Sequence, residues 1–512
     1  MGDFDNAGDR MRKTSLDLSG EEMRELASRA SDLAARYFAR LSDLPVFPQT
    51  TAGEIARRIR TPPPEEGETL SRLLDDCRAL MEANRHNGHP RMFGYVASPS
   101  TPVGAFANLL ASALNSNVTS WRSAPAATEV EKTVVRWLAE LIGYAAAGEE
   151  CGGLLTSGGS MANFIALYVA HRAGARAGES PSQKGLWGAS PPATVYTSDQ
   201  IHLSIPKAAD LLGLGREQVR LVATDENFRV DVRALRERIE ADKRAGLRPF
   251  CVVASAGTVN TGAVDPLAEV ARVAREHGLW FHVDGAYGAL ARLDASKREL
   301  FAGLELADSL SLDPHKWLYA PLDCGCLLLR EPDRARAAFA GTEESYIKVF
   351  EQDAEAFAFW DYGVELSRPF RALKVWAMLR YYGARRVAAC VAEDCALAEY
   401  MGERVAAADD FELLAPVTLG ICCFRYLPTD ARRALESTHD EAERERVNAG
   451  LDELNLRVMH AVQRGGQAYL SNATLRGRFA LRASITNFRT TRRDVDLTLD
   501  IVRRAAGELR EE

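Results

Sequence analysis

Long apolar runs are the first feature that this 512-residue sequence lacks. No segment approaches the roughly 20 consecutive apolar residues that a membrane-spanning helix needs. Residues 1–12 are polar and acidic, without the apolar stretch of a signal peptide. We therefore expect a cytoplasmic protein with no membrane partner.

The sequence also lacks an excess of positive charge and a cysteine framework. Its 63 lysine and arginine residues are outnumbered by 71 aspartate and glutamate residues, so the net charge of -8 gives no reason to expect a nucleic-acid partner. The nine cysteines are scattered, and their spacing does not match a zinc site. We interpret them as reduced, mostly buried thiols and expect no metal.

What is present is an ordinary globular composition, with 46% apolar and 26% charged residues. The length predicts two or three domains. Apolar residues recur at helical spacing over 20–42 and again over 70–81, with a proline-rich link at 61–68 between them. Two such helices cannot form a core alone, so we expect residues 1–89 to be a helical arm that wraps another surface, such as that of a partner subunit.

From residue 90 onward, short apolar runs alternate with helical segments such as 266–277. The expected strands are 193–197, 249–255, 279–283, 309–312 and 325–329. This alternation predicts an α/β domain over 90–370, built on a mostly parallel sheet with helices on both faces. Ligands of such sheets bind at the carboxyl ends of the strands.

Residues 371–512 predict a smaller C-terminal α/β domain, after a long helix that starts within 370–382. Its other expected elements are strands at 411–414, 421–424 and 479–485 and a charged helix at 440–463.

Near the end of the large domain, residues 338–357 show little periodicity. An irregular stretch of that length inside a compact domain is often a functional lid.

Lys316 is the most unusual lysine of the chain, because it stands among Pro314, His315, Trp317 and Leu318 directly after an expected strand. An amine with apolar neighbours is easier to keep uncharged, as a nucleophile requires. The alternative is a structural lysine whose stem lies on apolar surface at the end of a strand.

A glycine-rich segment, Gly158-Gly159-Ser160, joins an apolar pair to an expected helix. Small residues at a helix start leave backbone N–H groups free to converge on an anion, and Ser160 adds a hydroxyl. The segment matches neither the P-loop nor the dinucleotide pattern. A flexible turn with an N-cap serine is the alternative.

Three more polar residues follow expected strands: Asp284, His202 and Thr258. A buried carboxylate such as that of Asp284 is costly unless a cation or several donors pair with it. Each residue also has a structural interpretation, since Asp284 and Thr258 could cap turns and a lone histidine is more often structural than catalytic.

Together, these strand ends would bring a phosphate cradle, an imidazole, a carboxylate and a lysine to one edge of one sheet. Pyridoxal phosphate requires this set: a lysine for its aldehyde, an acid opposite its ring nitrogen, a group that stacks on its face and an anion site. The sequence therefore predicts a pyridoxal 5'-phosphate site.

From about Met23 to the C-terminus the chain resembles the group II pyridoxal-phosphate amino acid decarboxylases, which include aromatic amino acid, glutamate and cysteine sulfinate decarboxylases. The motifs that carry the resemblance are His89-Pro90-Arg91-Met92-Phe93, Ser123-Ala124-Pro125-Ala126-Ala127-Thr128-Glu129, Asp199-Gln200-Ile201-His202, His282-Val283-Asp284-Gly285-Ala286-Tyr287 and Asp313-Pro314-His315-Lys316-Trp317. The resemblance implies the aspartate-aminotransferase-like fold type I of pyridoxal-phosphate enzymes, with a mostly parallel seven-stranded sheet. It also implies a homodimer whose active sites lie at the subunit interface.

The resemblance implies a role for each matching residue. Lys316 would bind the cofactor aldehyde covalently, Asp284 would pair with the pyridine nitrogen, and His202 would stack on the ring. The other residues expected to contact the cofactor are Gly158, Gly159, Ser160, Thr258, Ala286, Asp313 and His315.

Tyr346 matches the tyrosine of the family's catalytic loop, which is proposed to return a proton after decarboxylation. Relatives that form aldehydes commonly carry phenylalanine there, so tyrosine favours simple decarboxylation; the alternative is an exposed loop tyrosine.

Asp313 departs from the asparagine that many relatives place near the phosphate, and its extra charge would need a donor or another orientation. The expected substrate pocket is more polar than in aromatic decarboxylases and contains Asn87, Val96, Asn117 and Thr119.

The function expected from these residues is decarboxylation of an L-amino acid, with an aromatic amino acid favoured, to give an amine and carbon dioxide. The alternatives are an aldehyde synthase or another fold type I enzyme, a decarboxylase of an acidic or small polar amino acid, and a non-catalytic scaffold that kept the fold.

Overall fold

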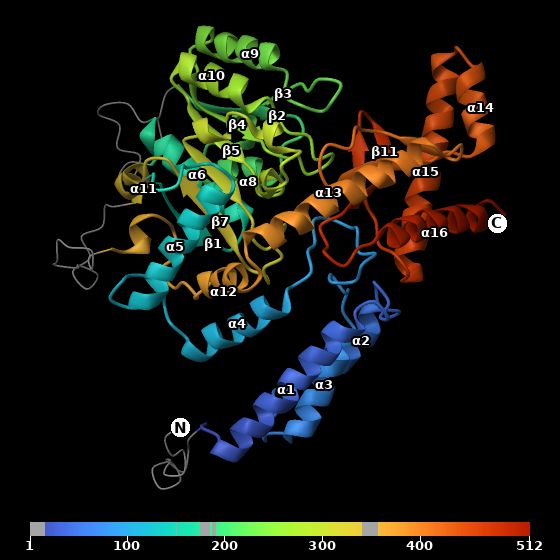
Figure 1. Ribbon diagram of the computed structural model, residues 1–512. Helices are drawn as coiled ribbons and strands as arrows, with labels where there is room; N and C mark the ends of the chain where they lie inside the picture. The colour runs from blue at the N-terminus through green and yellow to red at the C-terminus, as the bar shows by residue number, and fades with distance from the viewer. Residues whose placement is uncertain (1–15, 150, 175–184, 187–190, 340–356, 512) are drawn as a thin grey trace.

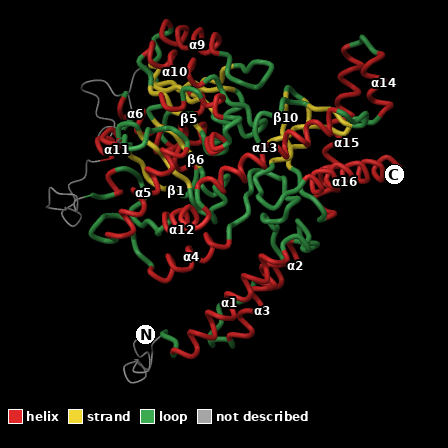
Figure 2. Tube along the Cα trace, in the orientation of Figure 1, coloured by secondary structure: helices red, strands yellow, loops and turns green. Residues whose placement is uncertain are grey.

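The computed structural model describes residues 16–149, 151–174, 185–186, 191–339 and 357–511. Figure 1 shows an N-terminal helical arm, a large α/β part and a smaller part that contains the C-terminus. The strands gather in two places, one in each of the latter parts (Figure 2). None of the described helices is long and apolar enough to cross a membrane.

The arm contains α1 (Gly20–Arg40), α2 (Ala52–Ile59) and α3 (Leu70–Glu82). The Ser19 hydroxyl and the Glu22 carboxylate form a capping box that starts α1. Helices α1 and α3 lie side by side and stand away from the rest of the chain (Figure 1), and no residue of the three helices is buried. Both predicted helices are confirmed, whereas α2 was missed because eight residues are too few to show a periodicity.

A seven-stranded sheet forms the centre of the large part, with the strand order β1-β7-β6-β5-β4-β2-β3. Neighbours from β3 to β6 run parallel, and only β7 runs antiparallel to the strands beside it. The mostly parallel seven-stranded sheet is therefore confirmed. Its strands are β1 (Gly152–Thr156), β2 (Ala193–Ser198), β3 (Val219–Val222), β4 (Arg248–Ser255), β5 (Trp280–Asp284), β6 (Ser309–Leu312) and β7 (Gly325–Leu329).

Every residue of β2, β5, β6 and β7 is buried, as expected of strands that are covered on both faces. Helix α5 packs against β1, α6 against β4 to β7, and α9 and α10 against β4. The helices of the large part are α4 (Pro102–Leu114), α5 (Pro125–Leu141), α6 (Gly159–Ala173), α8 (Ser204–Leu211), α9 (Val232–Arg244), α10 (Leu267–His277), α11 (Pro332–Phe339) and α12 (Ala372–Tyr382).

The smaller part has a four-stranded antiparallel sheet with the order β10-β11-β9-β8. Its strands are β8 (Phe411–Leu413), β9 (Ile421–Tyr426), β10 (Ser471–Leu475) and β11 (Arg478–Ser484). Its helices are α14 (Thr429–Ser437), α15 (Glu441–Gly465) and α16 (Arg492–Glu511). The three predicted strands and the charged helix are present, close to the expected bounds.

Helix α13 (Ala384–Ala406) runs from the large part to the smaller one. Its residues Val387 and Val391 belong to the core around the large sheet, whereas Met401 and Val405 belong to the core of the smaller part. A break at Gly383, whose φ is +75°, separates α13 from α12, so the long helix expected after 370 is two helices. The domain boundaries expected at 89/90 and 370/371 stay predictions.

Candidate functional site

The predicted site residues follow the carboxyl ends of neighbouring strands. Asp284 is the last residue of β5, His202 follows β2, and Lys316 follows β6. Strand β1 is antiparallel to β7, which is antiparallel to β6, so β1 runs parallel to β6 and delivers the Gly158–Ser160 segment to the same edge. One sheet edge therefore receives all of these groups.

A cavity of about 520 Å³ lies at this edge. Its walls include every described residue that the sequence predicted to contact the cofactor: Gly158, Gly159, Ser160, His202, Thr258, Asp284, Ala286, Asp313, His315 and Lys316. Tyr346 and almost all of the expected loop over 338–357 lie outside the described residues. The roles assigned to these residues stay predictions, but the structure places the described ones together.

Lys316 points its amine at Asp313. The distance between Lys316 Nζ and Asp313 Oδ2 is 3.0 Å, and His315 Nε2 lies 3.7 Å from the same oxygen. The Cys324 backbone N–H donates to His315 Nδ1 over 3.2 Å, and burial lowers the pKa of His315. A neutral His315 therefore carries its hydrogen on Nε2. The Asp313 carboxylate therefore has the Lys316 amine as its ion-pair partner.

The start of α6 forms a cradle without side chains. No side chain caps α6 at Gly158, so the first backbone N–H groups of the helix are not used by a cap. A Cβ at position 159 would lie 2.6 Å from the Ala286 Cβ and 3.1 Å from Asp313 Oδ2, so only glycine fits there. Ser160 is exposed beside it. Such a helix start can bind a phosphate through its N–H groups and its dipole.

Asp284 and His202 are both held by hydrogen bonds. Asp284 is buried, and its carboxylate accepts from Asn163 Nδ2 at 2.9 Å, from Ser311 Oγ at 3.2 Å and from the Ala286 N–H at 3.2 Å. The exposed His202 ring has its Nδ1 2.9 Å from Ser204 Oγ. Desolvation lowers the pKa of His202, while the negative charge of Asp284 opposes this shift.

Asn163 and Arg482 are among the groups at the cavity wall that were not predicted from the sequence. Arg482, on β11, is only 3% exposed, and its Nη2 has no hydrogen-bond partner among the described residues. Asn163 appears in the sequence only as one polar residue of a helix. Neither residue has a local signal, because the importance of each depends on groups that are distant in the chain.

Several secondary expectations meet a mixed outcome. The Thr258 hydroxyl lies 2.9 Å from Thr261 Oγ1 and accepts from the Ala263 N–H, so it supports a turn as well as lining the cavity. Asn87 and Val96 line a hollow of about 410 Å³, which shares Val96 and His315 with the main cavity. Asn117 and Thr119 do not line the main cavity, because the Asn117 side chain binds the Arg368 backbone N–H and Thr119 is buried with its carbonyl bonded to Phe359.

The site fits pyridoxal 5'-phosphate in shape and in chemistry. A lysine amine, an ionised carboxylate, an imidazole with an open face and a helix N-terminus are the four groups that this cofactor needs. They surround one cavity, and glycine at position 159 leaves space where any side chain would collide. Lys316, Asp284, His202 and the Gly158–Ser160 segment would hold the cofactor.

Comparison with known proteins agrees with this geometry. Residues 53–427 match the model of the pyridoxal-dependent decarboxylase conserved domain. The chain is 36% identical to an aromatic-L-amino-acid decarboxylase of Bacillus atrophaeus, over 93% of this chain and 94% of that protein. It is 29% identical to a phenylacetaldehyde synthase of Arabidopsis thaliana, over 96% of this chain and 97% of that protein.

Solved structures give the same result. The crystal structure of Oryza sativa TDC with PLP and tryptamine superposes with a TM-score of 0.87 and 29% identity, over 97% of this chain and all of that one. The crystal structure of mouse CSAD has a TM-score of 0.87 and 26% identity, over 96% of this chain and 99% of that one. The expected fold type I is therefore confirmed. The chain belongs to the pyridoxal-dependent decarboxylase family.

Proposed function

We propose that this enzyme removes the α-carboxylate of an aromatic L-amino acid as carbon dioxide and releases the corresponding amine. The observation that supports this proposal most directly is the convergence of Lys316, Asp284 and His202 on one cavity at the carboxyl edge of the sheet. When bound, pyridoxal phosphate supplies an electron-accepting ring that stabilises the negative charge left by departing carbon dioxide.

The residues of the chain prepare this chemistry. Lys316 Nζ would hold the cofactor aldehyde, and the carboxylate of Asp284 would keep a proton on the pyridine nitrogen. His202 would stack on the cofactor ring. The outcome would then depend on how the chain orients the substrate carboxylate. Tyr346 would return the proton.

Arg482 is the cation that we propose to orient the substrate carboxylate. Its Nε donates to the Asn260 carbonyl and its Nη1 to the Tyr95 carbonyl, which fixes the guanidinium at the cavity wall. The Nη2 group is buried and has no hydrogen-bond partner among the described residues, so a substrate carboxylate would supply the partner that it lacks. Burial lowers the pKa of Arg482 and makes its charge costly without such a partner.

The second candidate function is an aldehyde synthase, because the relatives include an enzyme of that name. Purified full-length protein supplied with pyridoxal phosphate would be assayed with aromatic amino acids, glutamate and cysteine sulfinate. A decarboxylase yields amine and carbon dioxide in equal amounts. An aldehyde synthase also releases carbon dioxide, but it consumes oxygen and water and yields aldehyde, ammonia and hydrogen peroxide in place of the amine. Carbon dioxide release from glutamate alone would contradict the aromatic assignment.

The first prediction concerns Lys316. Lys316→Ala should lose the visible absorption of the lysine-bound cofactor and at least a thousandfold of turnover, because no other described lysine lines the cavity. Absorption spectra and carbon dioxide release measure the two effects. Lys243→Ala, on the exposed face of α9, is the matched control and should retain both. A colourless but fully active Lys316→Ala enzyme would refute the cofactor assignment.

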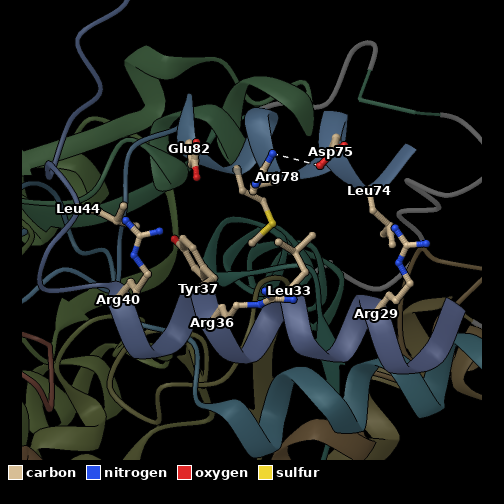
Figure 3. Close-up of a pocket in the computed structure, with 11 residues that line it drawn as sticks. Arg29, Leu33, Arg36, Tyr37, Arg40, Leu44, Leu74, Asp75, Arg78 and Glu82 are labelled. Atoms are coloured by element: carbon tan, nitrogen blue, oxygen red, sulfur yellow. Dashed lines mark hydrogen bonds and ion pairs between the residues drawn. The ribbon is translucent and has the colours of Figure 1, made fainter. Parts of the chain in front are cut away.

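We also propose a homodimer in the cytoplasm, with the active site near the subunit interface. The arm supports the dimer, since α1 and α3 enclose a hollow of about 350 Å³ but bury no residue. Figure 3 shows Leu33 and Tyr37 of α1 pointing toward α3 across this hollow. Its wall also carries Arg29, Arg36 and Arg40 and lacks the groups that a pyridoxal cofactor needs, which favours a structural role.

A further inference from the structure

A chain of buried hydrogen bonds meets at Asn163, in the second turn of α6. The Asn163 side chain is fully buried. Its Nδ2 donates to Asp284 Oδ2 and to Ser204 Oγ, each over 2.9 Å. Its Oδ1 lies 2.9 Å from His282 Nε2. All of its polar atoms therefore bond to other residues of the chain.

The direction of these bonds follows from chemistry. A carboxylate can only accept, so the Asn163 atom that faces Asp284 must be the amide nitrogen, and His282 Nε2 must donate to the amide oxygen. Burial lowers the pKa of His282 to about 4, so the ring is neutral and its Nδ1 accepts. The donor is the Ser309 hydroxyl at 2.9 Å, which itself accepts from Trp280 Nε1 at 2.8 Å; the Ser309 carbonyl also lies 3.2 Å from Nδ1.

A second branch reaches the stacking imidazole. Because Asn163 donates to Ser204 Oγ, the hydroxyl hydrogen of Ser204 is directed to His202 Nδ1, 2.9 Å away. The Ser204 backbone N–H donates to the same nitrogen over 3.2 Å. His202 Nδ1 is therefore an acceptor, and the ring hydrogen resides on Nε2.

We propose that Asn163 is a positioning residue that ties the carboxylate of Asp284 to the imidazole of His202 and holds both in one hydrogen-bonding state. The inference rests on the proposed cofactor site, because Asp284 and His202 are the groups on its ring nitrogen and its face. Asn163 keeps the carboxylate of Asp284 aimed, and through Ser204 it keeps the ring hydrogen of His202 on Nε2.

Other charges also act on His202. Those that face it are Asp284 and Asp313, which favour its protonated form, and Lys316 and Lys207, which oppose it. Ser204→Ala removes none of these four charges and leaves the Asn163 donor to Asp284 in place. A shift in the titration of His202 in this variant therefore reports the Ser204 branch.

The first test measures cofactor affinity. Asn163→Leu has a similar volume and no donor, so cofactor-free full-length protein carrying it should bind pyridoxal phosphate about tenfold to a hundredfold more weakly, as expected when a charged group loses a hydrogen bond. Ser204→Ala cuts only the His202 branch and should stay within about threefold of the unmodified protein. Titration with the cofactor, followed by visible absorption, gives both dissociation constants.

The second test measures the histidine directly. Deuterium exchange at imidazole carbon 2, read by peptide mass spectrometry, gives the titration midpoint of each histidine. In Ser204→Ala the hydroxyl that donates to His202 Nδ1 is lost, so the midpoint of His202 should rise by about half a unit. His86, which lies 3.1 Å from Tyr37 in the arm region, is the internal reference and should not move.

The outcomes separate the alternatives. Unchanged cofactor affinity in Asn163→Leu would overturn the proposal, and so would an unchanged His202 midpoint in Ser204→Ala. A general loosening of the fold would shift His86 as well and would also count against it. If Asn163→Leu does not fold, the titration midpoint of His202 in Ser204→Ala still tests the Ser204 branch of the proposal. Failure of the unmodified protein to bind the cofactor would instead overturn the proposed function and leave the His202 result interpretable.

Discussion

Asp313 is the residue whose charge is hardest to reconcile with a bound phosphate. It is 2% exposed, and its Oδ1 has no hydrogen-bond partner among the described residues. Its Oδ2 faces both the Lys316 amine and the first turn of α6, where a Cβ on Gly159 would lie 3.1 Å away. A phosphate at that helix start would therefore meet a carboxylate, and two like charges a few ångströms apart repel.

The prediction at this position is that Asp313→Asn tightens cofactor binding. The amide removes the repulsion and can donate to the phosphate, so the dissociation constant of pyridoxal phosphate should fall about threefold to tenfold. Asp199→Asn, which removes one charge outside the cavity, should leave it unchanged. Weaker binding in Asp313→Asn would instead mean that the ion pair with Lys316 is required to place the lysine.

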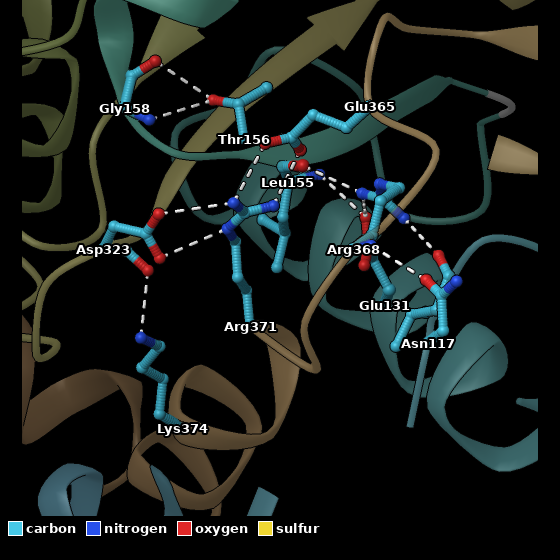
Figure 4. A network of polar contacts seen from close by, with 11 residues as sticks. Asn117, Glu131, Leu155, Thr156, Gly158, Asp323, Glu365, Arg368, Arg371 and Lys374 are labelled. Carbon is cyan, nitrogen blue, oxygen red and sulfur yellow. Dashed lines mark hydrogen bonds and ion pairs between the residues drawn. The ribbon is translucent and has the colours of Figure 1, made fainter. Parts of the chain in front are cut away.

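At the scale of elements, a buried ion pair joins three segments of the large part. Arg368 and Glu131 are both essentially unexposed, and Arg368 Nη2 lies 2.5 Å from Glu131 Oε1. Arg368 also donates to the carbonyls of Val118 and Leu155, and Glu131 accepts from the Leu155 N–H. Figure 4 shows this group beside Arg371, which pairs with Asp323. Helix α5, strand β1 and the segment before α12 are therefore fixed to one another.

The next prediction concerns this pair. Glu131→Gln leaves the Arg368 charge buried without a counter-ion and should destabilise the protein by about 3–5 kcal/mol, because a broken buried pair keeps its desolvation cost. The double variant Glu131→Gln with Arg368→Met should recover part of that loss. Denaturant unfolding followed by tryptophan fluorescence measures the difference.

A surface pair provides the control. Asp410 and Arg503 are each about one-third exposed, and their closest N–O distance is 2.7 Å. Asp410→Asn should therefore cost less than about 1 kcal/mol. Equal effects at the two pairs would contradict the claim that burial makes the Arg368 pair critical.

The elements predicted from the sequence are those with a strong one-dimensional pattern. The five apolar strands of the large sheet and the amphipathic α1, α3, α10 and α15 were found. Strand β3 was missed because it has four residues at a sheet edge, and β10 because its Ser-Asn-Ala-Thr-Leu sequence has no apolar run. Helix α4 was missed because apolar residues surround it and leave no stripe.

The residues of the site also divide into those that the sequence predicts and those that it does not. Lys316, Asp284 and His202 could be predicted because each follows a strand and belongs to a motif that the chain shares with its family. Asn163 and Arg482 could not, because segments that are distant in the chain must fold together before Asn163 meets Ser204 and before Arg482 meets Asn260 and Tyr95. Local sequence shows which side chains are unusual, but only the folded chain shows which of them meet.

At the scale of the whole molecule, α4 is unusual because it buries its small residues and exposes its large apolar ones. Its small residues Gly104, Ala107 and Ala111 are buried, and α4 packs against α12. Its large apolar residues point outward, with Leu109 56% exposed and Leu110 64% exposed. A contiguous apolar face of this kind is costly in water and is typical of an interface. The exposed arm and this apolar face of α4 both favour an interface with a second copy of the chain.

The last prediction tests whether the outward face of α4 lies in a dimer interface. The double variant Leu109→Glu with Leu110→Glu places two charges on the outward face of α4, and burying them in an apolar interface is strongly unfavourable. The unmodified protein should show twice the 56.1-kDa mass of one chain in light scattering after size-exclusion chromatography, whereas the variant should show a single chain mass at micromolar concentration. Leu221→Glu, on the outer edge strand β3 and at 59% exposure, is the matched control and should remain a dimer. A variant that keeps the doubled mass would exclude α4 from the interface, and loss of the dimer in both variants would mean that any added surface charge disrupts it.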